Sequence, residues 1–462
     1  MVEGTTEDAF AGRSDRIASP AMASYAFTTL GCRLNQAESD SMSEELARAG
    51  MSENRERPDV VVVNTCTVTR EATKASRSAI RRAVRNNPDA KVVVVGCYAV
   101  SDPDEVAAIE GVDVILDNND KERFVDALGQ SAPTAALLQI AMLNPRDPLG
   151  SSPANGASGP PPVPRVRANL KVQTGCDEWC TFCIIPTTRG GLRSFDPDEL
   201  VAEARTKVGA GARELVLTGV HLGKYSYDKG GDERELISLM RSLLGLDGVL
   251  RLRLSSIFPR HLTDEMLDFM ASEPRVCRHL HVPLQAGADG VLEDMHRPYR
   301  IEEYVDSVRR AQNALPGLAL ATDIIVGFPG ETDDDFESTL EVVRLLRFSK
   351  LHVFRYSPRP DTPAANMVDQ VGAETKKARS KRLIDLGNEL RAEFLAAHLD
   401  TPVEVLVEDV RDFDGITVCS GQTDDYVRVW FEDEAPLGSM VEVRGTRVRA
   451  DGLEGSLLTK VR

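Results

Sequence analysis

The chain has 462 residues, of which 42% are hydrophobic and 27% charged, and its formal net charge is −17. This length accommodates two to four domains, and the balanced composition excludes full disorder, collagen and small disulfide-stapled folds. No apolar run reaches the roughly 20 residues that cross a bilayer. Residues 1–22 lack the apolar stretch of a secretory signal and are predicted to be a flexible extension. We therefore expect a cytoplasmic protein without a membrane partner.

Residues 23–128 predict an N-terminal α/β domain. Its short β-branched runs lack the alternation of half-exposed strands, which is typical of parallel strands buried on both faces. The strands are expected at Tyr25–Leu30, Asp59–Asn64, Lys91–Gly96 and Val112–Leu116, with helices at Ala37–Ala49 and Arg70–Arg85. This alternation predicts a doubly wound parallel sheet.

Residues 129–165 form a predicted linker, because seven prolines fall between Pro145 and Pro164 among Ser, Gly, Ala and Asn. Residues 166–398 then alternate strand and helix six times. The strands are expected at Asn169–Gln173, Glu214–Thr218, Arg251–Ser255, Leu280–Leu284, Ala319–Val326 and Leu351–Tyr356. Repeated βα units predict a partial (βα)6 barrel with its chemistry at the carboxyl ends of the strands.

Residues 399–462 predict a small β-barrel, which completes an α/β chain of three domains. Strand-forming runs separated by Gly and Asp turns are expected at Val403–Glu408, Tyr426–Phe431, Met440–Arg449 and Leu453–Val461. Residues 401–462 carry seven Lys and Arg against thirteen Asp and Glu, a net charge of −6. Such a balance is poor for binding phosphates.

Three cysteines, Cys176, Cys180 and Cys183, follow the first barrel strand with the spacing C-x-x-x-C-x-x-C. Three thiolates on one loop suit a four-iron, four-sulfur cluster, since thiolates are the soft ligands of such iron. One iron then stays open to another ligand. Zinc is the alternative, but structural zinc takes four ligands and no fourth Cys or His lies close in sequence.

Three further cysteines, Cys32, Cys66 and Cys97, each lie just beyond a predicted strand of the first domain. Parallel strands end at one edge of their sheet, where ligands of open α/β sheets bind. A single cysteine there is more often a small buried hydrophobe, whereas three at matching positions predict a second cluster. Cys277 and Cys419 have no partner at ligand spacing and are predicted to be packed thiols.

The C-x-x-x-C-x-x-C loop at the mouth of a βα barrel resembles the radical S-adenosylmethionine superfamily, and two cysteine triads in this order resemble its methylthiotransferase family. The resemblance implies two 4Fe-4S clusters, a radical-generating one on Cys176, Cys180 and Cys183 and an auxiliary one on Cys32, Cys66 and Cys97. It also implies two S-adenosylmethionine molecules per turnover, one methylating sulfur at the auxiliary cluster and one yielding the radical that opens the target C–H bond. The implied S-adenosylmethionine contacts are Phe182, Thr218, Gly219, Gln285, Gly327 and Glu331.

Finer motifs resemble the branch that acts on threonylcarbamoyladenosine in tRNA. They are Thr29–Ser39, Asn64–Thr69, Leu217–Tyr225 and Tyr356–Ala364. The branch implies tRNA as partner, a TRAM-like RNA-binding C-terminal barrel, and methylthio insertion at C2 of N6-threonylcarbamoyladenosine 37. The alternatives are the same chemistry on isopentenyladenosine of tRNA or on a ribosomal-protein aspartate, and a non-catalytic Fe–S RNA-binding module. An electron donor and a sulfur source would be further partners, which the sequence does not identify.

Three positions depart from the pattern of the family. His221 stands where Asn is common, Phe258 where Glu is common and Asp361 where Gly is usual. These departures leave the cysteine chemistry intact and concern the contacts with substrate.

Basic side chains that suit RNA lie outside the C-terminal module. Arg70, Lys74, Arg77, Arg81, Arg82 and Arg85 recur at three- or four-residue spacing, so most share one helix face; Lys376, Lys377, Arg379, Lys381 and Arg382 form a second cluster. A solvated helix face is the alternative for each. Tyr426, Trp430 and Phe431 either stack on bases or fill the barrel core, and His279 and His281 are expected to line the barrel.

Overall fold

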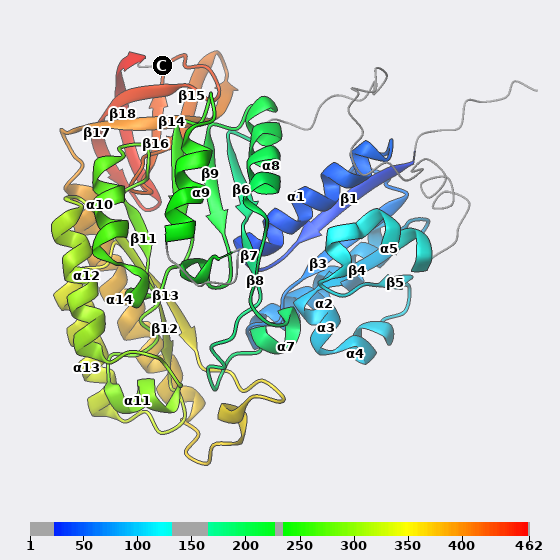
Figure 1. Ribbon diagram of the computed structural model, residues 1–462, viewed down its shortest axis with the longest axis horizontal. Coiled ribbons are helices and arrows are strands. Elements are labelled where there is room, and N and C mark those ends of the chain that lie inside the picture. The colour runs from blue at the N-terminus through cyan, green and yellow to red at the C-terminus, as the bar shows by residue number, and fades with distance from the viewer. Residues whose placement is uncertain (1–22, 132–164, 227–233, 461–462) are drawn as a thin grey trace, which may run out of the picture.

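The computed structural model describes residues 23–131, 165–226 and 234–460. The expected extension at 1–22 and residues 132–164 of the expected linker lie outside this part of the chain. Figure 1 shows an N-terminal domain in blue and cyan beside a central body in green and yellow, with the red C-terminal barrel against one end of that body. Among the described residues, no helix is both long and apolar enough to cross a membrane.

The N-terminal domain is a doubly wound parallel sheet, as predicted. Its strands are β1 (Ser24–Thr29), β2 (Ser52–Glu53), β3 (Val60–Thr65), β4 (Lys91–Gly96) and β5 (Val114–Ile115), in the order β2-β1-β3-β4-β5. Alternate residues of one strand enter two separate cores: Val60 and Val62 pack in one, Val61 and Val63 in the other. Burial on both faces is why these strands read as continuous valine runs.

Helices cover both faces of this sheet. They are α1 (Arg33–Arg48), α2 (Arg70–Asn86), α3 (Cys97–Ser101), α4 (Pro103–Ala107) and α5 (Phe124–Ser131). Helix α1 begins earlier than its predicted start at Ala37, because Cys32 takes the extended N-cap conformation without giving a side-chain hydrogen bond. The sequence therefore lacked the Ser, Thr, Asp or Asn signal of a helix start. Helix α5 runs past the expected domain boundary at 128.

The central body is an open barrel of six parallel strands, as predicted. They are β6 (Arg167–Lys171), β9 (Glu214–Thr218), β10 (Arg251–Leu254), β11 (His279–His281), β12 (Ala319–Val326) and β13 (Lys350–Arg355). Two three-stranded sheets, β10-β9-β6 and β11-β12-β13, meet through parallel bridges such as Ser256 with His281. The prediction of β11 as Leu280–Leu284 was wrong at its end, because Pro283 has no N–H to donate and Gln285 turns the chain with φ +65°.

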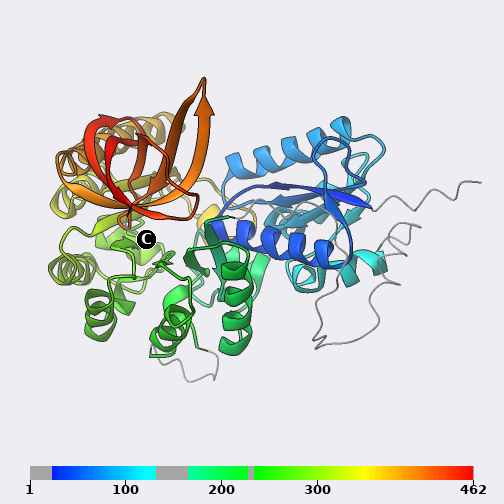
Figure 2. The same ribbon diagram turned by 90° about the horizontal axis from the view of Figure 1, so that it is seen from above.

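Helices line the outer side of the barrel, which Figure 2 shows from above. The longer ones are α8 (Pro197–Gly209), α9 (Arg234–Leu244), α10 (Asp264–Ser272), α12 (Ile301–Ala314), α13 (Asp333–Leu346) and α14 (Ala373–Ala396). Shorter elements follow the strands at the carboxyl end: the β7 (Gln173–Thr174) and β8 (Arg193–Ser194) pair, α7 (Ile185–Arg189) and α11 (Asp289–Asp294).

The C-terminal domain is a closed barrel with the order β14-β15-β16-β18-β17. Its strands are β14 (Pro402–Phe413), β15 (Ile416–Gln422), β16 (Arg428–Glu432), β17 (Met440–Arg449) and β18 (Gly452–Lys460). Strand β15 was not predicted, because its Ser-Gly-Gln end consists of weak strand formers. In the structure β15 is stabilised by hydrogen bonding to β14 on one edge and to β16 on the other.

This barrel closes the amino-terminal end of the central barrel. The buried Arg253 pairs with Glu214 at 2.6 Å and donates to the backbone oxygens of Thr423 and Asp424. Tyr426 follows, its ring 4.4 Å from the Arg253 guanidinium and its hydroxyl accepting a 2.7 Å hydrogen bond from Arg33. The chemistry of the carboxyl ends is thus left on the opposite, open side.

Candidate functional site

The structure brings Cys32, Cys66 and Cys97 to one edge of the N-terminal sheet. Cys66 directly follows β3, Cys97 directly follows β4, and Cys32 caps α1 after β1. These three strands are neighbours in the sheet, so their carboxyl ends coincide as the sequence predicted. The loops approach closely: a methyl group at Gly31 would lie 2.8 Å from Sγ of Cys66.

A buried ionic network lies beside this triad and joins it to the barrel. Arg189, at the end of α7, donates to Glu38 at 2.7 Å and to Asn35 at 2.5 Å. Lys121 donates to the other oxygen of Glu38 at 2.7 Å and to Asn64 at 3.0 Å. Burial opposes ionisation of Glu38, but the two cations outweigh it and hold its pKa well below the usual range. The positive charge of Arg189 also acts on Cys97 and Cys32.

The second triad lies on the loop between β7 and α7. Gly175 precedes it with φ +70°, and a Cβ there would lie 1.9 Å from the Gly191 carbonyl oxygen. The Cys176 amide donates to the Gly190 oxygen at 3.2 Å, and that of Cys183 to the Cys180 oxygen at 2.9 Å. These backbone contacts fold the loop that carries the three free thiols, and Cys183 lines a cavity beside it.

Arg297 donates a 3.3 Å hydrogen bond to Sγ of Cys180. Its guanidinium lies 4.3 Å from the ring centre of Phe258 and donates to the Tyr299 hydroxyl at 3.0 Å. Hydrogen bonds to ligand sulfurs and nearby charge set the properties of iron–sulfur sites. Arg297 follows α11 without any motif, so sequence reasoning missed it, as it missed Arg189.

Two of the three departures from the family pattern contact each other. The rings of His221 and Phe258 lie 4.2 Å apart at 31°, so an aromatic pair stands where the family has polar residues. Burial, together with the neighbouring His261, lowers the pKa of His221 to about 3. The neutral imidazole therefore packs against Phe258. The third departure, Asp361, has φ +64°, a left-handed conformation that explains the usual glycine.

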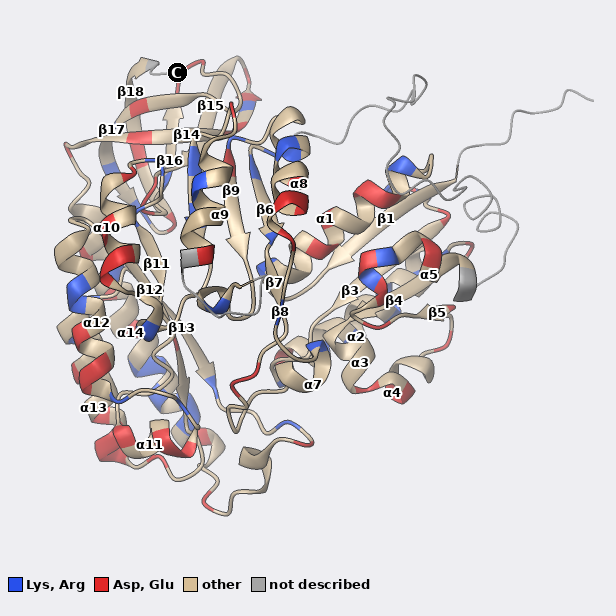
Figure 3. Ribbon diagram, viewed as in Figure 1, with Lys and Arg blue, Asp and Glu red and all other residues tan. Residues whose placement is uncertain are grey.

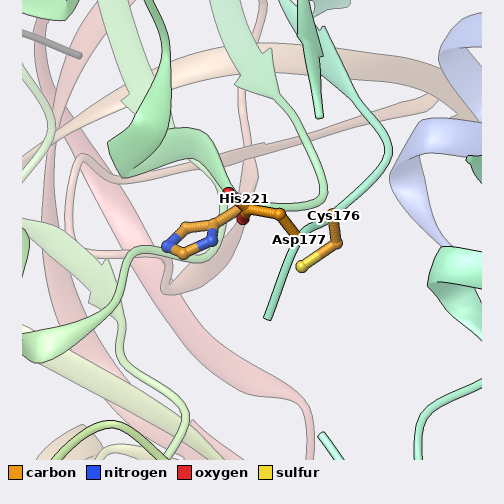
Figure 4. Close-up of side chains that lie close together, drawn as sticks. All are labelled: Cys176, Asp177 and His221. Carbon is orange, nitrogen blue, oxygen red and sulfur yellow. The ribbon is translucent and has the colours of Figure 1, made fainter. Parts of the chain in front are cut away.

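Charged groups surround the first cysteine of the loop. Figure 4 shows Cys176, Asp177 and His221 beside one another, with their ligand atoms within 4.8 Å. Glu178 contacts Lys224 at 2.7 Å and also Arg260. Although burial raises the pKa of Glu178, these cations lower it to about 2.

The predicted S-adenosylmethionine contacts lie in the cysteine loop and at or just beyond the carboxyl ends of β9, β11 and β12. Phe182 and Gln285 line a cavity of about 200 Å³. Thr218 ends β9, and a Cβ at the adjoining Gly219 would lie 2.8 Å from Oε1 of Gln173. Gly327 follows β12 and donates its amide to Glu331 at 2.6 Å.

The carboxylate of Glu331, the last predicted contact, forms hydrogen bonds within the protein. Besides Gly327 it accepts a 2.5 Å hydrogen bond from Arg379. Burial raises its pKa despite that cation. The carboxylate therefore shapes the turn after β12.

The cavity lies between the two domains, next to both triads. Val68 and Thr69, which follow Cys66, form one wall, and Cys183 with Ile185 forms another. Arg355 and Ser357 border it from the end of β13. Nearby, Arg359 joins the domains by donating to two buried threonine hydroxyls of the N-terminal domain at 3.0 and 2.6 Å.

The remaining candidates fall into structural roles. Cys277 and Cys419 are packed thiols with 1% and 0% exposure, as predicted. His279 stacks on Tyr426 and His281 on a neighbouring histidine of β13, inside the barrel. Of the two alternatives for Tyr426 and Phe431, the structure favours a structural role: three arginines surround Tyr426, and Phe431 lies in the barrel core. Trp430 keeps a partly exposed ring between Arg428 and Arg449.

The second basic cluster is largely neutralised. Arg379 pairs with Glu331 and Asp333, Lys381 and Arg382 pair with acidic side chains, and Lys376 lies over the Tyr356 ring. Arg379 and Arg382 thereby fasten α14 to α13 and to the turn before it, whereas the Lys381–Asp385 pair lies within α14.

The donor chemistry of both triads fits iron–sulfur clusters better than zinc. Ligands of one tetrahedral zinc ion at 2.3 Å lie about 3.8 Å apart, yet among the described residues neither triad brings its sulfurs within 4.8 Å of one another. Burial raises the pKa of Cys66 to about 11 and that of Cys183 to about 12. Such thiols ionise only beside added positive charge, which bound iron supplies.

Comparisons with known proteins agree with this geometry. Residues 24–117 match the uncharacterized protein family UPF0004, and residues 170–343 match the radical SAM superfamily. The chain is 39% identical over 432 residues to the threonylcarbamoyladenosine tRNA methylthiotransferase MtaB of Bacillus subtilis (strain 168), covering 92% of this chain and 94% of the relative. It is 36% identical over 471 residues to the tRNA-2-methylthio-N(6)-dimethylallyladenosine synthase of Sorangium cellulosum (strain So ce56), covering 96% and 94%.

A solved structure shares the fold. The radical S-adenosylmethionine methyltransferase TsrM from Kitasatospora setae, with cobalamin and a [4Fe-4S] cluster bound, superposes with a TM-score of 0.50 at 16% identity, over 74% of this chain and 77% of that one. The matches along nearly the whole chain confirm the resemblance read from the cysteine motifs. The chain belongs to the radical S-adenosylmethionine methylthiotransferase family, whose members transfer sulfur-containing groups.

Proposed function

We propose that this enzyme inserts a methylthio group at C2 of N6-threonylcarbamoyladenosine 37 in tRNA. The observation that carries the proposal is the cavity between the two domains, which Arg355 helps to line; the guanidinium of Arg355 also lies 3.6 Å from the exposed Glu71 carboxylate. A threonylcarbamoyl group bears a carboxylate, which pairs well with a guanidinium. A dimethylallyl group is a hydrocarbon and cannot form an ion pair with this cation. The 39% identity to the Bacillus subtilis enzyme named for this nucleoside supports the same choice.

Two clusters and S-adenosylmethionine are part of the proposal. Cys176, Cys180 and Cys183 would hold the radical-generating cluster, with Arg297 donating to the sulfur of Cys180. Held there, S-adenosylmethionine supplies one-electron chemistry, which an unactivated C–H bond requires. Phe182, Thr218, Gly219, Gln285 and Gly327 would contact it, and Glu331 would act through the turn that it holds.

The N-terminal triad would hold the auxiliary cluster. Cys32, Cys66 and Cys97 supply three thiols at one sheet edge. Val68 and Thr69, just beyond Cys66, line the cavity together with Cys183, which supports this assignment. Arg189 and Lys121 contribute positive charge beside it. The product sulfur and the reacting carbon would then meet within one water-poor space.

Nucleoside analysis of tRNA by mass spectrometry tests the substrate. A deletion strain is expected to lose methylthio-threonylcarbamoyladenosine and to accumulate the nucleoside without the methylthio group. Loss of the methylthio-isopentenyl nucleoside instead would assign the chain to the other tRNA branch. Unchanged methylthio nucleosides would refute a tRNA substrate.

The role of Arg355 is tested with the purified, reconstituted enzyme. Arg355→Gln removes a charged hydrogen bond worth about 1.5–3 kcal/mol, so kcat/KM for the threonylcarbamoyl substrate should fall about 10- to 150-fold. Arg347→Gln, on an exposed turn outside the cavity, is the matched control. Equal effects of the two changes would contradict the proposed carboxylate contact.

Iron content tests the two clusters. The anaerobically reconstituted protein should carry about eight irons per chain, and about four when Cys32, Cys66 and Cys97 are replaced by alanine. Cys277→Ala and Cys419→Ala should leave eight. Zinc in place of iron, or no 5′-deoxyadenosine formed from S-adenosylmethionine and reductant, would refute the cluster assignment.

A further inference from the structure

A groove with a volume of about 840 Å³ runs along α2, next to the cavity. One side is the outward face of α2 and the other is the segment 358–361 that follows β13. Ile184 borders both the groove and the cavity, so the two spaces are adjacent. Seven cations line the groove. They are Arg70, Lys74, Arg77, Arg81, Arg82 and Arg85 on α2 and, at the inner end, the buried Arg359.

The cations of this groove are unusual because most are unpaired. Within the described ranges, five of them on α2 have no acidic side chain within 4.0 Å, and all five are exposed. Arg77 alone on this face pairs, with Glu105 at 2.6 Å. On α14, by contrast, Arg379, Lys381 and Arg382 are paired with acidic side chains. The outer helices α11 and α13 carry acidic residues (Figure 3). A free basic strip in a chain of net charge −17 therefore indicates an anionic partner.

Stability alone does not favour this strip. Arg70 with Lys74, and Arg77, Arg81 and Arg85, repeat at four-residue spacing, which places like charges side by side on one helix. Each such pair destabilises a helix by about 0.2–0.5 kcal/mol. The opposite face of α2 is what packs on the sheet, through residues such as Ile80 and Ala83.

The dimensions of the strip suit one nucleic-acid strand. The fifteen residue steps from Arg70 to Arg85 span about 22 Å at 1.5 Å per residue. One strand of a duplex presents about six phosphates over that length at 3.4 Å each. A strand whose target base enters the cavity would leave it beside Arg70 and Arg359 and pass along α2.

We propose that the α2 groove binds the phosphate backbone of the substrate RNA, on the side of the strand that leaves the cavity. This inference rests on the proposed function in taking RNA as the substrate, and adds where its backbone lies. The contact is electrostatic and independent of base sequence. Arg81, Arg82 and Arg85, at the far end of the strip, would act on affinity for RNA rather than on the reacting nucleoside.

The test measures binding of a fluorescein-labelled RNA hairpin by anisotropy over a range of salt concentrations. The variant carries Arg81→Gln, Arg82→Gln and Arg85→Gln together. The matched control carries Arg205→Gln, Arg309→Gln and Arg344→Gln, which remove three exposed, unpaired arginines from α8, α12 and α13, outside the groove. Both variants change net charge equally, and circular dichroism verifies that each is folded.

Loss of three phosphate contacts should reduce the slope of log K against log salt by about 2, at about 0.7 per contact. Binding should then be about 100-fold weaker at 0.1 M salt and converge with wild type near 1 M. The control triple variant should keep the wild-type slope. Asp361→Asn, which removes an acidic group from the groove wall, should act in the opposite direction and strengthen binding.

Equal slopes for the two triple variants would overturn the proposal. The proposal would also be overturned if the α2 triple variant bound RNA as wild type does and lost activity only when an acidic redox protein supplied the electrons. The groove would then be a protein-docking site. This test and the nucleoside assay can fail separately. If the groove binds RNA but the deletion strain keeps its tRNA nucleosides unchanged, only the proposed substrate is refuted.

Discussion

Replacing Glu38 by Gln would leave Arg189 and Lys121 buried without their counter-charge. Glu38 has 2% side-chain exposure and contacts each of these cations at 2.7 Å. A third cation, Lys171, lies 3.6 Å from the Glu38 carboxylate. Because Arg189 belongs to the barrel and Glu38 to the N-terminal domain, this network fastens the two cysteine triads to each other. The variant therefore tests whether their relative placement depends on a buried ion pair.

The expected loss of stability is large. Removing one partner of a buried pair destabilises by about 3–5 kcal/mol, since the remaining charge is uncompensated. The matched control, Glu44→Gln, breaks the contact with Lys207 at the same domain boundary, but Glu44 has 35% side-chain exposure. Solvent screening limits such a pair to about 1 kcal/mol or less.

Hydrogen exchange followed by mass spectrometry resolves the region concerned. Protection of peptides from α1 and α7 should fall by roughly two to three and a half orders of magnitude in Glu38→Gln, and by about fivefold or less in Glu44→Gln. If the two variants lose protection equally, the buried network does not hold the domains together.

The effect also has a defined pH dependence. Folding lowers the pKa of Glu38, so its contribution is complete above the ordinary glutamate pKa near 4.3 and is lost as pH falls through the lower folded value. The difference between wild type and Glu38→Gln should therefore be constant near neutrality and shrink below about pH 4.

Three further outcomes are expected. Gly175→Ala should abolish iron binding at the radical site and leave about four irons per chain, because the added Cβ would lie 1.9 Å from the Gly191 carbonyl oxygen. The control Gly191→Ala, whose added Cβ has no atom within 4 Å, should keep about eight irons. Burial disfavours charged His398, but its 2.5 Å contact with Asp425 prevails and raises its pKa. The stabilisation is complete below the unfolded pKa near 6.5 and lost as pH rises through the folded value; Asp425→Asn should remove this dependence in thermal denaturation of the full chain. Arg359→Gln leaves two buried threonine hydroxyls without their donor and should lower stability by about 1–3 kcal/mol, as urea denaturation would measure.

The contact between His221 and Phe258 gives a physical account of two departures from the family pattern. Each is unremarkable alone, and sequence spacing gives no reason to connect them. In the structure the two ring centres lie 4.2 Å apart. The guanidinium of Arg297 also contacts the Phe258 ring. The aromatic pair thus supports the arginine that donates to Cys180.

The sequence by itself determined the architecture and the two cysteine triads. Valine runs buried on both faces define β3 and β4, and a cysteine directly after each strand must lie at one edge once the strands are parallel neighbours. The C-x-x-x-C-x-x-C spacing needs no tertiary information, because a short loop already keeps its thiols together. Local periodicity and spacing carry these features.

Only the tertiary structure decided which distant side chains meet. Arg189 and Glu38 lie in different domains, and Arg297 reaches Cys180 from another loop, so no periodicity encodes these contacts. The two basic helices look equally suited to RNA in sequence, yet acidic neighbours neutralise α14 and leave α2 free. Whether a charge is paired depends on three-dimensional neighbours, since Coulomb interactions act through space and fall with distance.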